Sequence, residues 1–175
     1  MPGYEALEIA VEKRDAEKLQ LLLKRFSTRN PDWYRDNVFS TLLHRAASSK
    51  GAAKVVDILI AAGAPVWKQD NDGWIPLHFA AARGNMGIVK AFLATGSIDV
   101  NSRDIDKTTA LHLAAENHQC EVVAELIAAG ADVNVRKSHD GLTPLHGAVL
   151  SGTEEHVDIV NMLLAAGAVV DIVER

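Results

Sequence analysis

A short stretch that returns four times at a constant interval constrains the fold of this chain more than any other feature. The copies read TLLHRAA at residues 41–47, IPLHFAA at 75–81, TALHLAA at 109–115 and TPLHGAV at 143–149. Their histidines are His44, His78, His112 and His146, so each step along the chain is 34 residues. A period of about 20 to 50 residues is the sequence signature of stacked repeats. We therefore predict a fold in which one structural unit is repeated and each unit packs against the next.

Glycines mark the ends of two short helices in each unit. The first helix is followed by Gly51, Gly84 or Gly152, and the second by Gly63, Gly96, Gly130 or Gly167. Glycine takes the left-handed conformation that commonly ends a helix. Between these glycines the second helix carries an apolar stripe at helical spacing, as in Val55, Val56 and Leu59. Each unit therefore reads as helix, turn and helix, followed by a loop.

The unit resembles the ankyrin repeat, which is about 33 residues long and carries Thr-Pro-Leu-His-x-Ala. The resemblance implies an all-α fold, an ankyrin-repeat solenoid of stacked helix-turn-helix units with β-hairpin-like finger loops. The extra residue of each 34-residue step falls near Lys50, within 97–101 or within 136–139, and a larger insertion lies near 153–155. All of these positions are in turns or loops, which a 33-residue unit with independent insertions explains.

We predict a single ankyrin-repeat domain over residues 1–175. Its parts are a degenerate N-terminal capping repeat at 5–25, a long connector at 26–40, repeats at 41–66, 67–101, 102–135 and 136–170, and the start of a further finger or tail at 171–175. The capping repeat has charged outer positions, which suits a unit that faces water on one side. The helix at 159–164 lacks such a polar face, so we expect a fragment of a longer protein, the alternative being a frayed end with exposed apolar residues.

Charge and amino-acid composition restrict the cellular compartment of the protein and the class of molecule that it binds. The net charge of −5 argues against a nucleic-acid partner, because phosphate contacts need basic surfaces. No apolar run reaches the length of a membrane span, and residues 1–5 lack a secretory signal pattern. Cys120 is the single cysteine, which favours a reducing compartment. We expect a cytoplasmic protein, with the nucleus, or the host cytosol for a secreted effector, as alternatives.

Catalytic and metal-binding interpretations find little support. The four repeated histidines should lie about 10 Å apart in successive layers, whereas zinc ligands lie about 2 Å from one ion. His118, Cys120 and Glu121 are close in sequence, but a half-buried surface turn explains them. No phosphate-binding glycine loop occurs, and the serines at 48–49 and 151 lack a base in register. We expect no metal, no cofactor and no enzymatic activity.

Several positions depart from the repeat pattern. Phe39 and Lys107 occupy the place of the turn glycine, and His118 replaces the glycine between helices. A left-handed conformation there costs about 1 kcal/mol per residue. Ile75 stands where threonine would cap the helix. We expect units that are individually weak and held by neighbour contacts, with the repeated histidines bonding to backbone and tying adjacent units together.

The resemblance places partner contacts at the finger tips and on the exposed side of the first helices. The apolar residues there are Trp74, Ile105, Leu142 and Leu150, and the charged rim consists of Arg83, Asp106 and Glu116. Tryptophan is common in interface hot spots, so these residues are predicted to dock a partner protein. The alternative is that Trp74 packs on Trp67 across its own finger.

Two further interpretations remain open at this stage. The aromatic residues Trp33 and Tyr34 in the connector either cover the first helix pair or form a functional loop. Asn134 resembles ankyrin asparagines that an asparaginyl hydroxylase modifies in animal cells, whereas Asn101 fits less well. The alternative for Asn134 is hydrogen bonding within the finger.

Three classes of function fit a monomeric protein of this kind. The first is a scaffold or adaptor, including an effector that engages host proteins. The second is a stoichiometric inhibitor of a kinase or transcription factor, as in some small ankyrin proteins. The third is the targeting arm of a larger enzyme. The sequence identifies neither the partner protein nor the pathway.

Overall fold

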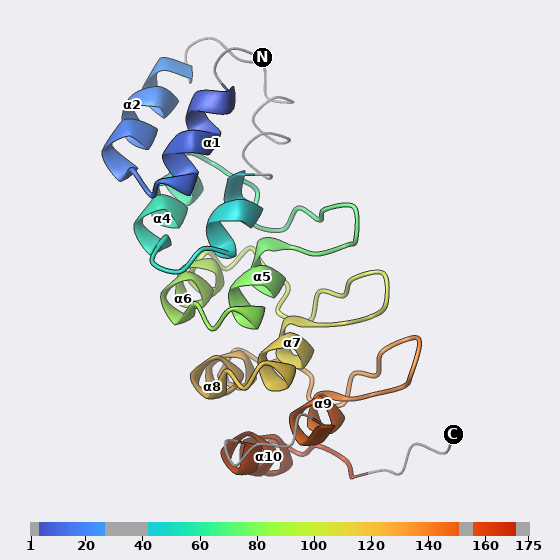
Figure 1. Ribbon diagram of the computed structural model, residues 1–175. Coiled ribbons are helices and arrows are strands. Elements are labelled where there is room, and N and C mark those ends of the chain that lie inside the picture. Colours follow the sequence, from blue (N-terminus) through green and yellow to red (C-terminus); the bar gives the residue numbers. More distant parts are fainter. Residues whose placement is uncertain (1–3, 27–41, 151–155, 171–175) are drawn as a thin grey trace.

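Pairs of antiparallel helices stack in chain order in the computed structural model, which describes residues 4–26, 42–150 and 156–170 (Figure 1). The first helices are α1 (Tyr4–Glu12), an unlabelled helix at 42–47, α5 (Pro76–Ala82), α7 (Ala110–Glu116) and α9 (Pro144–Leu150). The second helices are α2 (Ala16–Phe26), α4 (Ala53–Ala61), α6 (Met86–Ala94), α8 (Cys120–Ala128) and α10 (His156–Ala165). The predicted all-α solenoid is confirmed. We name the four repeats with a histidine the His44, His78, His112 and His146 units.

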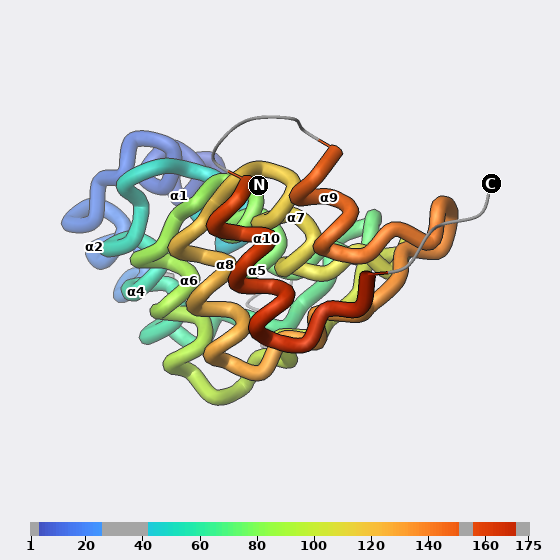
Figure 2. Tube along the Cα trace, turned by 90° about the horizontal axis from the view of Figure 1, so that it is seen from below, coloured from blue at the N-terminus to red at the C-terminus, as the bar shows by residue number. Residues whose placement is uncertain are grey.

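Along the stack, first helices pack on first helices and second helices on second helices, as the view along the stack shows (Figure 2). First helices contact first helices, α5 with α7 and α7 with α9, while α4, α6, α8 and α10 contact one another in turn. The alanine pairs 80–81 and 114–115 are fully buried, so small side chains lie where first helices pack together. One hydrophobic core runs from Leu7 to Leu163, so neighbouring units share their buried surface.

Some predicted segments lie outside the described residues. These are 27–40 of the connector, with Trp33, Tyr34 and Phe39, the insertion at 153–155, and the tail at 171–175. Phe26, which was assigned to the connector, is the last residue of α2.

Among the residues that the structure describes, three that are not glycine adopt the left-handed backbone conformation. Lys107 has φ 60° and His118 has φ 56°, as their places in the pattern predicted, and Arg14 in the capping repeat has φ 54°. Lys107 corresponds to Gly73 one unit earlier, which has φ 82°. A Cβ on Gly73 would lie 3.0 Å from the backbone of Asp104 and Ile105 in the next finger. Gly73 is therefore required twice, for its φ angle and for the close approach of the next finger.

The fingers project beside the first helices on one side of the stack (Figure 1). A backbone bond closes each tip: Asp70 N–H donates to the carbonyl of Trp74 at 2.9 Å, and Asp104 N–H donates to that of Thr108 at 3.0 Å. In the His146 unit the bond runs from Lys137 to Leu142, one residue further along the chain. The extra residue predicted within 136–139 therefore lies in this tip.

Candidate functional site

The repeated histidines tie each unit to the next. Nε2 of His44 lies 2.9 Å from the carbonyl oxygen of Trp74, which belongs to the following finger. Nε2 of His78 lies 3.2 Å from the Thr108 oxygen, and Nε2 of His112 lies 3.2 Å from the Leu142 oxygen. The predicted link from histidine to the backbone of an adjacent unit is confirmed at these three junctions.

The other ring nitrogen fixes the tautomer. The backbone N–H of Ile75 donates to Nδ1 of His78 at 3.1 Å, and that of Thr109 donates to Nδ1 of His112 at 3.2 Å. Because Nδ1 accepts, the ring proton is on Nε2, which donates to the carbonyl of the next unit. Each neutral ring thus satisfies one backbone group in its own unit and one in its neighbour.

Burial keeps these rings neutral. Both His78 and His112 are fully buried. Burial lowers the pKa of His112 to about 4, Lys137 adds to this lowering, and the Leu142 carbonyl opposes it. The pKa of His78 is lowered by burial against the opposing effects of the Thr108 carbonyl and the Asp104 carboxylate. These histidines are therefore structural groups, since a buried charge without a partner is costly.

Finger tips of successive units are joined directly by backbone. Ile105 N–H donates to the Asp72 carbonyl at 3.2 Å, and Ser138 N–H donates to the Asp106 carbonyl at 2.7 Å. The Gln69 amide adds a bond to the Arg103 carbonyl at 3.1 Å. The tips of the His78, His112 and His146 units therefore form a continuous edge.

A hollow of about 380 Å³ opens between these fingers and the first helices. We call it the finger hollow, and its lining consists of Asp72, Trp74, Asp104, Ile105, Asp106, Thr108, Leu113 and Lys137. It combines an aromatic ring and two aliphatic side chains with three carboxylates and one amine. Such a mixed concave surface can receive an apolar side chain that is flanked by polar groups.

Trp74 forms part of the wall of the finger hollow. Its indole Nε1–H donates to Oδ2 of Asp104 at 2.9 Å. Its ring lies 4.9 Å from that of Phe79 and 5.9 Å from that of His78, between ring centroids. Trp74 is half-buried within the stack, and its ring partners are Phe79 and His78 rather than Trp67, the partner in the alternative interpretation, which is 56% exposed.

The structure brings together part of the predicted contact set. Trp74, Ile105 and Asp106 line the finger hollow, and Ile105 is 69% exposed at its edge. Glu116 joins them indirectly, because it forms an ion pair with Lys137, which also lines the hollow.

The remaining predicted residues lie apart from the finger hollow. Arg83 is exposed and lines a separate hollow of about 400 Å³ beside Gly84 and Gln119. Leu142 is half-buried, and its carbonyl is the acceptor of His112. Leu150 is 71% exposed at the end of α9. The predicted apolar strip is therefore divided between the finger hollow and the His146 unit.

Sequence reasoning missed three charged residues of the finger hollow, Asp72, Asp104 and Lys137. Asp104 recurs 34 residues after Asp70, so the repeat spacing was a usable signal for it. Lys137 had none, because its approach depends on the longer tip of the next finger. Its ion pair with Glu116 also depends on Gly147, where a Cβ would lie 2.7 Å from Cγ of Glu116.

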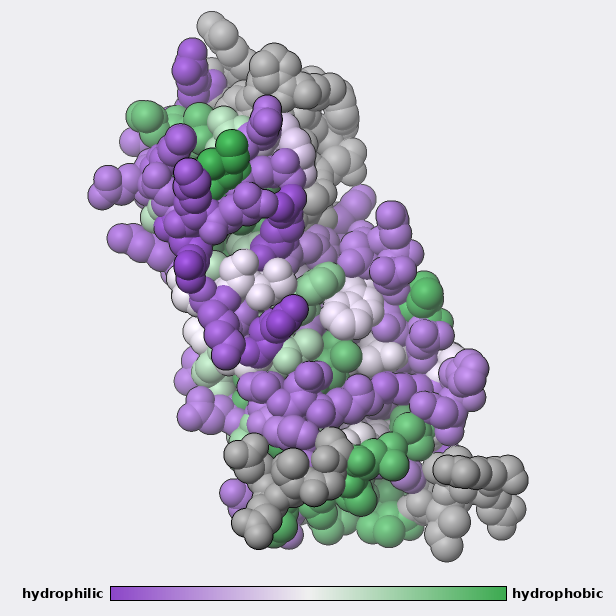
Figure 3. Space-filling view, viewed as in Figure 1, coloured by the Kyte–Doolittle hydropathy of each residue, from purple (hydrophilic) through white to green (hydrophobic). Residues whose placement is uncertain are grey.

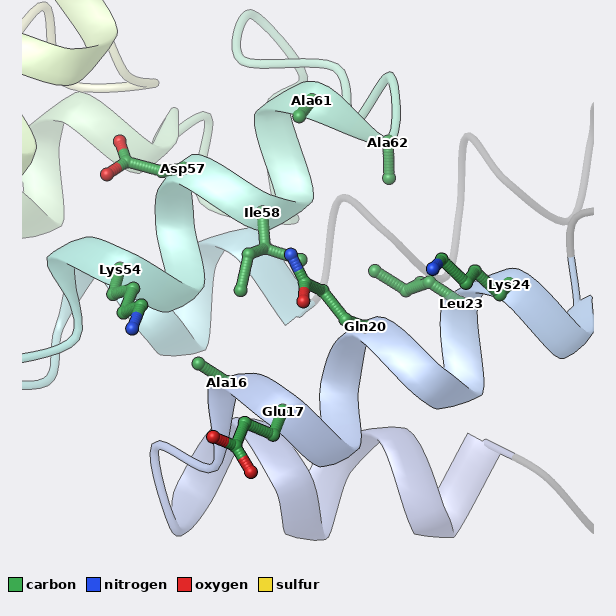
Figure 4. A pocket seen from close by; sticks show the side chains of 10 residues that line it. All are labelled: Ala16, Glu17, Gln20, Leu23, Lys24, Lys54, Asp57, Ile58, Ala61 and Ala62. Carbon is green, nitrogen blue, oxygen red and sulfur yellow. The ribbon is translucent and has the colours of Figure 1, made fainter.

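A larger hollow of about 560 Å³ lies between α2 and α4, on the second helices (Figure 4). Its apolar floor includes Leu23 and Ile58. Its walls carry both signs of charge, with Glu17, Lys24, Lys54 and Asp57. This balance favours no class of ligand, so the finger hollow is the better candidate.

Asn134 links two units through both ends of its amide. Its Nδ2 donates to the Gly167 carbonyl at 3.0 Å, and its Oδ1 accepts from Val169 N–H at 2.8 Å. Asn101 makes the same pair of bonds one unit earlier, to Gly130 and Asp132. The bonds of Asn134 therefore reach the next unit rather than staying within its own finger. Its hydroxylation stays a prediction.

The turn at His118 holds two imidazoles in contact. The rings of His118 and His156 stack with centroids 4.1 Å apart. Burial raises the pKa of the nearby Cys120 thiol.

Within the described ranges, no three His, Cys, Asp or Glu side chains are grouped so that they could hold a metal ion. The described helices likewise include none that is long and apolar enough to span a membrane.

Comparison with known families agrees with this architecture. A model described as "Ankyrin repeats (3 copies)" matches residues 43–137, and one described as "Ankyrin repeat" matches residues 140–175. The chain belongs to the ankyrin repeat family. No curated protein matches it in a sequence search. Ankyrin repeats are generally protein–protein interaction modules and are typically non-catalytic.

Proposed function

We propose that this chain is a scaffold, adaptor or effector recognition module that binds a partner protein through the finger hollow and the adjacent first helices. The observation that carries the proposal is Ile105, whose side chain is 69% exposed beside the half-buried Trp74 in a concave site. Tryptophan is enriched in interface hot spots, and the exposed aliphatic side chain beside it adds apolar surface that a partner can cover. We likewise propose that the chain acts by binding its partner and catalyses no reaction.

The charge of the finger hollow indicates which side chains a partner segment should carry. Asp72 and Asp106 are exposed in the lining of the hollow, and Lys137, its one lysine, is paired with Glu116. A partner segment with a basic side chain beside an apolar one suits this lining better than an acidic segment. Association should weaken as salt screens the exposed carboxylates.

Ile105 is the cleanest position at which to test the proposal. Trp74 also holds Asp104 and packs on Phe79, so Trp74→Ala would alter stability and binding together. We therefore compare Ile105→Asp with the matched control Trp67→Ala, which removes an exposed apolar side chain outside the hollow.

The readout is quantitative affinity purification with mass spectrometry, followed by titration of each captured protein. Proteins that bind through the hollow should be lost with Ile105→Asp and retained with Trp67→Ala, at an unchanged melting temperature. Equal capture by Ile105→Asp and the parent would overturn the proposal. The identity of the captured protein also separates an adaptor from an inhibitor of a kinase or transcription factor, or from the targeting arm of an enzyme.

A further inference from the structure

A hollow of about 400 Å³ lies at the turns between first and second helices, at the other ends of the first helices from the fingers. Three successive units line it, with Lys50 from the His44 unit, Arg83 from the His78 unit and Gln119 from the His112 unit. We call it the turn hollow. No carboxylate is among the described residues that line it, whereas three carboxylates line the finger hollow. The two hollows therefore differ in the sign of their charge.

The cations of the turn hollow have no carboxylate partner in the part of the chain that the structure describes. Lys50 and Arg83 are both exposed, and neither takes part in an ion pair there. By contrast, Arg45, Lys90 and Lys137 each pair with glutamate. Two cations that share a concave surface without a compensating charge attract an anion.

A third cation lies beside the turn hollow. Nη1 of Arg14 donates to the carbonyl of Lys50 at 2.8 Å. A Cβ on Gly51, which lines the hollow, would lie 3.6 Å from the same Nη1 atom. Arg14 belongs to the α1–α2 end of the stack, where hydrophilic residues crowd in Figure 3. The bond to Lys50 therefore holds a further positive charge next to the hollow.

The turn hollow is specific to one junction of the stack. Arg83 is followed by Gly84 and, at the start of α6, by Gly87, which faces Ala53 of α4 without a side chain of its own. One unit later, the places of Arg83, Gly84 and Gly87 hold Asn117, His118 and Glu121. These residues remove the cation, fill the space and add a carboxylate. The hollow and its charge are thus properties of this chain and not of the repeat pattern.

We propose that the turn hollow binds a phosphate group carried by a side chain of a partner protein. A phosphate monoester has close to two negative charges at neutral pH and three acceptor oxygens, which suit two unpaired cations with Arg14 beside them. A carboxylate has one charge and would leave this set undercompensated. Clusters that contain arginine are a recurring means of recognising phosphorylated side chains.

The charge of the whole chain favours a single phosphate over a nucleic acid. The net charge is −5, and the carboxylates of the finger hollow lie on the same molecule. A polyanion needs an extended basic surface, whereas one phosphate group needs only the turn hollow. The site is separate from the finger hollow, so the proposal stands independently of the function proposed above.

The test is a titration of the isotope-labelled 175-residue chain at neutral pH, followed by magnetic resonance. The probe is N-acetylated phosphoserine amide, and N-acetylated aspartate amide is the carboxylate of similar shape. The phosphoserine probe should shift the amide signals of Gly84 and Gly87, which line the hollow, and leave that of Gly73 in the finger unchanged. The aspartate probe should bind on the order of 10-fold more weakly.

Single substitutions locate the site. Arg83→Gln and Lys50→Gln should each raise the Kd of the phosphoserine probe on the order of 10-fold, because each removes a charged donor from the hollow. The matched control is Arg103→Gln, which makes the same change of charge at an exposed position in the finger of the His112 unit and should leave the Kd unchanged. Thermal melting checks that all three variants fold.

Several results would contradict the proposal. They are the absence of a shift at Gly84 and Gly87, equal affinity for the aspartate probe, and a loss in Arg103→Gln as large as that in Arg83→Gln. Tighter binding of inorganic phosphate would point to a free anion, and tighter binding of a single-stranded oligothymidylate at the same glycines would point to nucleic acid. None of these results bears on the finger hollow, because the two sites share no lining residue.

Discussion

The His78 and His112 units share one backbone plan but differ at its most demanding positions. The His78 unit has Gly73 at its finger tip, whereas the His112 unit holds Lys107 in the same left-handed conformation. The His112 unit caps its first helix with the Thr109 side chain, whereas Ile75 of the His78 unit has no side-chain acceptor to offer. Each unit thus lacks a feature that the other has.

This comparison shows which interaction both units keep and which positions can hold an unfavourable residue. Both units keep the histidine whose Nδ1 accepts from its own cap residue and whose Nε2 donates to the next finger. Local departures cost about 1 kcal/mol, which shared burial between neighbours offsets. The contacts between units are therefore expected to govern stability more than the quality of any one unit.

The largest expected effect is the loss of a histidine bridge. His112→Ala leaves the Thr109 N–H and the Leu142 carbonyl without their partner and opens a cavity, so the free energy of unfolding should fall by roughly 2–4 kcal/mol. His78→Ala should cost a similar amount. Urea denaturation measures both, with the exposed His139→Ala as control. A loss no larger than that of the control would show that the bridges add little to stability.

Acid should weaken the same junction. The pKa of His112 is about 4 in the folded chain, below the ordinary 6.5, so the unfolded chain binds more protons between these values. Stability is complete above pH 6.5 and falls as the pH drops toward 4, by about 2 kcal/mol at pH 5. Denaturation at pH 7 and pH 5 should show a smaller acid loss in His112→Gln than in the parent. Equal losses would contradict a neutral buried ring.

Exchange of residues at the two finger tips gives opposite signs. Gly73→Ala should destabilise by about 1–2 kcal/mol, because its Cβ meets the next finger and its φ is positive. Lys107→Gly should stabilise by about 1 kcal/mol, because it relieves the left-handed lysine. Thermal melting of both variants checks the pair. The comparison fails if the two substitutions shift the melting temperature in the same direction.

The smallest expected effect concerns the cap. Thr109→Val keeps the shape of a buried side chain but removes the hydroxyl that lies 2.9 Å from Nδ1 of His112 and accepts from its backbone N–H. A loss of about 1 kcal/mol is expected. Ile75→Val is the matched change where no side-chain cap exists, and it should show only the cost of one methylene, which is also near 1 kcal/mol. The distinguishing readout is acid titration, because only Thr109→Val alters the environment of a histidine ring.

Features that belong to the repeating unit were predictable from the sequence. The left-handed Lys107 and His118 follow from their places in the pattern, since the backbone must turn there whichever residue is present. The histidine bridges follow because the same side chain returns at the same place in every unit. In these cases one unit supplies the whole argument.

Contacts between units that are made by residues found in only one unit were not predicted. The alternative for Trp74 was packing on Trp67, but its indole donates to Asp104 in the next finger, which the stacking of units brings within hydrogen-bond distance. The ion pair of Lys137 and Glu116 depends on an inserted tip residue and on the missing side chain of Gly147. Such contacts depend on three-dimensional offsets between units, which a one-dimensional pattern does not contain.

The histidine row also supplies the molecule with its own spectroscopic reporters. An imidazole N–H in contact with water exchanges its proton too fast to be seen by magnetic resonance, whereas one held in a buried bond is retained. His78 and His112 are fully buried with such protons, one for each of two successive junctions. Loss of either N–H signal would therefore report that one junction between units has opened while the rest of the stack stays folded.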